Sequence, residues 1–135
     1  MDARGHLAET RASLSTSPLV RSITVVEERL GYDYGYFRAR LTLFNDDFLE
    51  VAEYFVIQDD QVQVRRYRYQ WMGGSQRVLK KRWDNTKHFP ELPNFPDHVH
   101  VGEEELARPG QSLTIIGLLS LMERKLRADS DIADV

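Results

Sequence analysis

The sequence predicts an α+β fold: a five-stranded antiparallel meander sheet with an N-terminal helix and a C-terminal helix packed on it. Residues 19–83 contain five runs rich in β-branched and aromatic residues, separated by short turns rich in Gly, Asn and Asp. Such short connections join antiparallel neighbours, because parallel strands need crossovers of a dozen residues or more. Residues 3–15 and 112–127 have the composition and apolar spacing of helices.

The elements are expected in this order along the chain. Residues 3–15 form the first helix, and Ser17-Pro18 ends it because proline disfavours helix in the residue before it. The strands are expected at 19–30, 36–44, 48–57, 62–71 and 77–83. Ser112 is the expected N-cap of the last helix. Its apolar stripe consists of Ile115, Leu118, Leu119, Met122 and Leu126, and its final turns carry Arg124, Lys125 and Arg127, which suit the helix dipole.

Length and composition indicate a single domain over residues 1–135. The chain has 135 residues, 41% of them hydrophobic and 29% charged, as in ordinary globular proteins. With no cysteine, a disulfide framework and a thiolate metal site are both excluded. No segment has the roughly 20 apolar residues of a membrane helix, and the start lacks the apolar core of a signal peptide. We therefore expect a cytoplasmic protein with no membrane association.

Charge is distributed unevenly along the chain. The net charge is −3, yet residues 65–87 contain eight basic residues and one acidic residue, Asp84. An asymmetry of this kind can attract an anionic partner to one face of a protein.

Within this segment, residues 65–71 alternate cations with aromatic rings. In a strand, Tyr67 and Tyr69 share one face, while Arg66 and Arg68 share the other. A hairpin with guanidinium groups for phosphates and rings for unstacked bases suits single-stranded nucleic acid. The alternative is that the rings belong to the core and the cations to a solvated face. The predicted nucleic-acid-binding residues are Arg66, Arg68, Lys80, Lys81, Arg82, Lys87, Tyr67 and Trp83.

Residues 84–109 are expected to form a long histidine-rich loop, since they contain four of the five prolines and no clear period. His98 and His100 would point the same way in an extended segment. They could share a metal with His88 or Asp97 as a third ligand. They could instead act as general acid and base on a phosphodiester, because imidazole titrates near neutral pH. A purely structural role, bonding backbone groups, is the third possibility.

The metal-free acid–base chemistry is favoured, and no cofactor is expected. The predicted catalytic residues are His88, His98, His100, Asp84 and Tyr69. Asp84 would orient a histidine or, with Asn85, cap the loop. His6, which is isolated near the N-terminus, is expected to be exposed to solvent.

The motifs of these two segments resemble the TumE-like toxins of prokaryotic toxin–antitoxin systems, over roughly residues 15–125. The resemblance is carried by Tyr67-Arg68-Tyr69-Gln70-Trp71, Arg82-Trp83-Asp84-Asn85, His88, Pro90-Glu91, Phe95-Pro96 and His98-Val99-His100. The sequence departs from the family pattern where Thr86-Lys87 stands for Ala-Pro, and where Phe89 and Asp97 each stand for a histidine. The resemblance implies a small toxin encoded beside a helix-turn-helix antitoxin, with RNA and that antitoxin as partners and a homodimer as a further possibility.

Together, the residues and the resemblance predict a toxin acting on RNA, specifically an endoribonuclease that uses histidine acid–base chemistry. Two alternatives remain open. One is a non-catalytic module that binds nucleic acid or protein, and the other is a metal-dependent phosphodiester or nucleotide enzyme.

Overall fold

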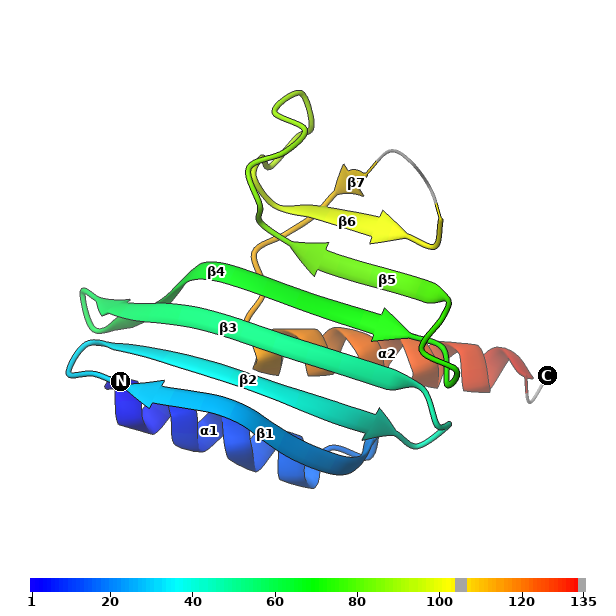
Figure 1. Cartoon of the computed structure of the whole chain (residues 1–135), viewed down its shortest axis with the longest axis horizontal. Helices are drawn as coiled ribbons and strands as arrows, with labels where there is room; N and C mark the ends of the chain where they lie inside the picture. Colours follow the sequence, from blue (N-terminus) through cyan, green and yellow to red (C-terminus); the bar gives the residue numbers. More distant parts are fainter. Residues whose placement is uncertain (104–106, 134–135) are drawn as a thin grey trace.

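The computed structural model describes residues 1–103 and 107–133, and within 127–133 only the backbone. In the order of the described sequence, one helix comes first, seven strands follow, and a second helix comes last (Figure 1). The elements are α1 (Ala3–Thr16), β1 (Val20–Leu30), β2 (Tyr34–Leu43), β3 (Phe48–Gln58), β4 (Gln61–Met72), β5 (Leu79–Asp84), β6 (His98–Val101), β7 (Arg108–Pro109) and α2 (Ile115–Ala133). Among the described residues, no helix is both long enough and apolar enough to cross a membrane.

The strands form one antiparallel sheet in the order β1-β2-β3-β4-β5-β6-β7, which confirms the predicted α+β meander. The predicted number of strands was wrong, because β6 and β7 lie inside the segment expected to be a loop. The His-Val-His-Val sequence of β6 alternates with period two. Val99 is paired with the core residue Trp83 and packs against the core, while the histidines point to the other face. A strand of four residues in a proline-rich segment is too short to be recognised from its periodicity.

Both helices lie on the same face of the sheet and leave the other face uncovered (Figure 1). The apolar side chains of β2 and β3 point toward the helices, as the alternation in 36–44 predicts. In α2, four residues of the predicted stripe are buried and the fifth is partly buried, which confirms it: Ile115, Leu118, Leu119, Met122 and Leu126. The side chain of Arg127 lies outside the described residues.

The two helices begin with side-chain caps, and one of these caps differs from the prediction. Asp2 accepts a hydrogen bond from the Gly5 amide (2.7 Å) at the start of α1. Ser112 is not the cap of α2, because Thr114 Oγ1 accepts the Gly117 amide (3.0 Å) and the helix begins at Ile115. A tertiary bond fixes this start, since the Ile115 amide donates to a buried carboxylate of β3, as described next.

Glu53 of β3 is fully buried and links the two helices to the sheet. Its Oε1 accepts the Ile115 amide, and its Oε2 lies 2.8 Å from His6 Nε2 of α1. The expectation that His6 is exposed was therefore wrong, since only 3% of its surface is accessible. The reason is tertiary: its partner lies 47 residues away in the chain.

Candidate functional site

Strands β4, β5 and β6 align the predicted site residues across the uncovered face. Asp84 of β5 is paired with Arg68 of β4 on one side and with His98 of β6 on the other. Arg82 is paired with His100 in the same way. Because directly opposed residues in antiparallel strands point to the same face, their side chains gather there. The pairing on which the sequence-based site depends is therefore present.

Asp84, His98 and His100 form a compact cluster at the centre of this arrangement. Asp84 Oδ1 lies 2.9 Å from His98 Nε2, and Asp84 Oδ2 lies 3.9 Å from His100 Nε2. One ligating atom from each residue lies within 4.8 Å of the others. The Asp84 and His98 side chains are almost fully buried, whereas 14% of the His100 side chain is exposed.

The two oxygens of Asp84 are also held by neighbouring groups. The Thr86 amide donates to Oδ1 (3.0 Å), which forms the loop cap predicted as one of two roles for Asp84. Arg82 Nε donates to Oδ2 (3.3 Å). Asn85 bonds instead to the backbone of β4, accepting from the Tyr67 amide and donating to the Arg65 carbonyl. Asp84 thus both caps the loop and contacts the imidazoles.

The ring nitrogens of His98 have different surroundings. Nδ1 lies 2.9 Å from the Pro96 carbonyl oxygen, which can only accept, so Nδ1 carries the proton. Nε2 is close to Asp84 Oδ1 but lacks the alignment of a hydrogen bond, and it has no other hydrogen-bonding partner among the described residues. His98 therefore has no nitrogen facing solvent that could exchange a proton with a substrate.

His100 and His88 are the more accessible imidazoles. Burial lowers the pKa of His100, and the nearby positive charge of Arg82 lowers it further, against the opposing effect of Asp84. His88 is exposed and precedes Phe89, whose ring packs edge-on against His98 and His100, with centroids 5.4 and 5.9 Å away. Phe89 thus covers the cluster, while His88 stands at its outer margin.

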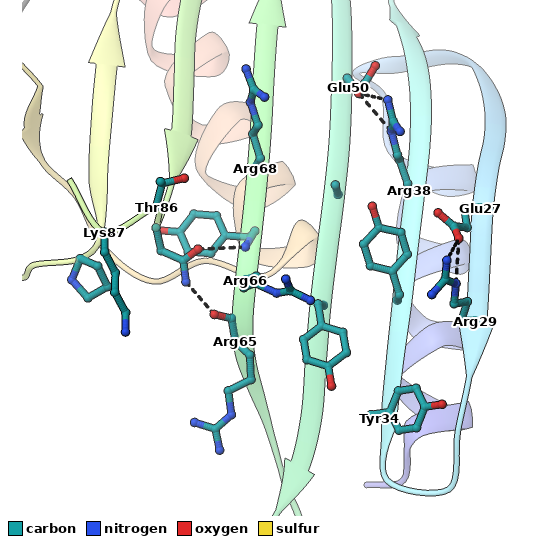
Figure 2. A pocket seen from close by; sticks show the side chains of 16 residues that line it. Glu27, Arg29, Tyr34, Arg38, Glu50, Arg65, Arg66, Arg68, Thr86 and Lys87 are labelled. Carbon is teal, nitrogen blue, oxygen red and sulfur yellow. Dashed lines mark hydrogen bonds and ion pairs between the residues drawn. The ribbon is translucent and has the colours of Figure 1, made fainter.

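A groove of about 870 Å³ crosses the uncovered face next to this cluster (Figure 2). Figure 2 shows Arg65, Arg66, Arg68 and Lys87 on one side of it and the pair Arg38–Glu50 on the other. Its other lining residues include Tyr34, Tyr36, Tyr54, Thr86 and Pro96. Thr86 and Pro96 also bond to Asp84 and His98, so the groove borders the cluster directly.

The cations of the groove differ in how far they are neutralised. Arg38 and Arg29 form ion pairs with Glu50 and Glu27. Four others form no ion pair with a carboxylate among the described residues: Arg65, Arg66, Arg68 and Lys87. Arg66 lies over the Tyr54 ring, 5.1 Å from its centroid. The groove therefore combines free positive charge with exposed aromatic surface.

Of the three aromatic residues predicted from the sequence, Tyr67 is among the residues that line the groove, whereas Tyr69 and Trp83 are not. Tyr67, Tyr69 and Trp83 point to the helix-covered face and are buried. Tyr69 donates to the Leu113 carbonyl (2.7 Å), and burial raises the pKa of Tyr69 well above its ordinary value. Burial and the hydrogen bond to Asp97 likewise raise the pKa of Tyr67. These rings pack in the core, and we leave them out of the site proposed below.

Lys80 and Lys81 are also separate from the groove. Lys80 donates to Asp47 and lies over the Trp71 ring, with Nζ 5.1 Å from its centroid. Lys81 points toward α2, where burial and the neighbouring Lys125 lower the pKa of Lys81 to about 8. Of the eight predicted nucleic-acid-binding residues, four line the groove, namely Arg66, Arg68, Lys87 and the buried Tyr67, and Arg82 contacts the cluster.

Sequence reasoning missed the three tyrosines of the groove, Tyr34, Tyr36 and Tyr54. The signal was present in the alternation. Tyr36 and Tyr54 each precede a buried phenylalanine in the same strand, Phe37 or Phe55, and therefore point to the other face of the sheet. These strands offer aromatic residues on both faces, and only the position of the helices decides which rings stay exposed.

The fold and the site define a small α+β protein with a buried carboxylate–imidazole cluster beside a basic, tyrosine-lined groove. The family model described as Toxin TumE matches residues 10–129. The chain belongs to the TumE toxin family, and membership implies a cognate antitoxin. Comparisons with curated proteins and with solved structures give no match.

Proposed function

We propose that this toxin acts on RNA, as an endoribonuclease that holds a single strand in the groove and cleaves it beside Asp84. The observation that carries the proposal is the set of four groove cations that pair with no described carboxylate, next to three accessible tyrosine rings. Free cations bind phosphates, and flat rings stack on unpaired bases, each stacked base contributing about 1–3 kcal/mol. A duplex would not present its bases to these rings, which favours a single strand.

Cleavage would proceed by attack of a ribose 2′-hydroxyl on the adjacent phosphorus. The 2′-oxygen loses its proton to a base and forms a bond to phosphorus, while the bond from phosphorus to the 5′-oxygen breaks. The leaving 5′-oxygen then takes up a proton, so the products are a 2′,3′-cyclic phosphate and a 5′-hydroxyl. His88 is the exposed imidazole suited to one proton transfer, and Arg82 supplies positive charge next to the cluster.

The test is cleavage of a labelled single-stranded RNA by purified protein, with binding measured separately on a 2′-O-methyl strand that cannot be cleaved. We expect a doubly substituted R66A/R68A protein to lose binding and cleavage together, and H88A to lose cleavage while still binding. R4A is the matched control, because Arg4 is exposed on α1, away from the groove. Equal cleavage by wild type and all variants would refute the assignment.

The same groove suits the cognate antitoxin. We propose that a helix-turn-helix antitoxin covers these cations with acidic residues, since complementary charge speeds association. Co-purification of the two proteins should then weaken with rising salt and in the R66A/R68A variant. Co-purification unaffected by both would place the antitoxin on another surface.

A further inference from the structure

Asp84, His98 and His100 have the composition and spacing of a metal site. From these residues we infer that the cluster binds one divalent first-row transition-metal ion of the zinc type. Metal–nitrogen and metal–oxygen bonds of about 2.1 Å in a tetrahedral site put ligand atoms about 3.4 Å apart. Asp84 Oδ1 and His98 Nε2 lie 2.9 Å apart, slightly closer than that value, and one ligand atom from each of the three residues lies within 4.8 Å of the others. Small side-chain shifts would therefore bring all three atoms onto one ion.

The orphaned nitrogen of His98 is the strongest evidence for an ion. With its proton on Nδ1, the ring presents the Nε2 lone pair to a carboxylate oxygen 2.9 Å away. Two lone pairs at this distance repel each other unless a cation lies between them. Nε2 is buried and has no hydrogen-bonding partner among the described residues, although such atoms are nearly always satisfied. A bound metal ion would satisfy it.

The groups around the cluster have the arrangement usual for metal ligands. The Pro96 carbonyl fixes the tautomer of His98, as outer-shell carbonyls commonly do for ligating histidines. The Thr86 amide holds the Asp84 carboxylate at Oδ1, the oxygen nearer to His98. Arg82 occupies Oδ2, which leaves Oδ1 as the ligand atom from Asp84.

Two imidazoles and one carboxylate also limit the kind of ion. Imidazole favours ions such as Zn²⁺, whereas Mg²⁺ and Ca²⁺ prefer oxygen ligands alone. Three protein ligands leave a position open, which is typical of catalytic rather than structural zinc sites. The ring of Phe89 covers part of the cluster, and 14% of the His100 side chain remains exposed.

The sequence favoured metal-free chemistry, and for a metal shared by His98 and His100 it offered His88 or Asp97 as the third ligand. Asp97 is bound by the Tyr67 hydroxyl (2.8 Å) and lies outside the cluster, as does His88. Asp84 takes that place, because β5 and β6 pair it with His98. Metal binding itself does not depend on RNA cleavage; only a catalytic role for the ion rests on the proposed function.

The experiment is titration of chelator-stripped full-length protein with ZnCl₂, followed by calorimetry, and with CoCl₂, followed by its visible absorption. We expect one ion per chain, cobalt bands typical of low coordination number, and no comparable binding of MgCl₂. D84N, H98Q and H100Q should each weaken binding by more than about 100-fold, since even outer-shell changes cost about 10–100-fold. H88Q is the matched control for metal affinity, because it removes an imidazole outside the cluster.

Circular dichroism of each variant separates loss of the site from loss of the fold. If D84N does not fold, H100Q still tests the site, because His100 is the most exposed of the three residues. Zinc binding by wild type that is lost in the cluster variants supports the site even if no RNA is cleaved. Failure of wild type to bind zinc or cobalt, or equal weakening in H88Q, overturns it even if RNA is cleaved.

Discussion

The proposed groove predicts how strongly salt should weaken RNA binding. For single strands, the logarithm of the association constant falls by about 0.7 per neutralised phosphate for each tenfold rise in salt. If each of the four groove cations that form no ion pair within the described part of the chain contacts one phosphate, the slope is about −2.8. Raising salt from about 50 to about 200 mM should then weaken binding about 50-fold.

Replacing Arg68 by glutamine tests this number, because it removes one of these four charges. The slope should fall to about −2.1, and the same rise in salt should weaken binding only about 20-fold. Fluorescence anisotropy with an uncleavable 2′-O-methyl strand measures both slopes, and Arg4→Gln on α1 is the control. Tyr54→Leu should instead weaken binding at every salt concentration with the slope unchanged, because stacking carries no charge. An unchanged slope in Arg68→Gln, or equal loss of slope in Arg4→Gln, would refute the reasoning.

Three further predictions concern the fold and the cluster. Glu53→Leu should lower the free energy of unfolding by about 3–5 kcal/mol in urea denaturation, because it leaves a buried imidazole of α1 and the first amide of α2 unpaired. Lys81→Met removes a partly buried cation that lies next to Lys125. It should therefore raise the free energy of unfolding at pH 7 by about 1 kcal/mol, because solvent screens part of the repulsion between the two lysines. The pKa of Lys81 is lowered to about 8 from 10.5, so the unfolded state binds more protons between these values. Wild-type stability should therefore gain a contribution that rises from pH 8 to 10.5, which the variant lacks. Phe89→Gly should speed modification of His98 by diethylpyrocarbonate, measured by peptide mass spectrometry, because the ring that covers it is gone; an unchanged rate would show that other groups shield it.

The long strands were predictable because their signals are local. Period-two alternation in residues 36–44 and turns such as Asn45-Asp46-Asp47 depend only on neighbours in sequence. The C-terminal stripe was predictable for the same reason, since helical spacing is visible within two turns. The start of that helix was not, because its first amide bonds to Glu53, 62 residues away.

The site was predictable only in part. The histidines and Asp84 could be named, but β5 and β6 lie 13 residues apart in the chain, and sequence does not reveal their register. The faces of β4 raised a different difficulty. Both its tyrosines and its arginines are plausible ligands for RNA, and burial of the larger apolar surface decided that the tyrosines face the helices.

The register of β4, β5 and β6 also connects the two proposals. Arg68, Asp84 and His98 occupy directly opposed positions on three neighbouring strands. Opposed residues in antiparallel strands have Cα atoms about 4.5–5.5 Å apart and point to the same side. A phosphate held by Arg68 would therefore lie one strand away from the carboxylate proposed to bind the metal. A one-residue shift of β5 would turn Asp84 to the helix side and separate them. The proposed binding surface and the proposed metal site thus depend on one register, and a variant that disrupts β4–β5 pairing should abolish both metal binding and RNA binding.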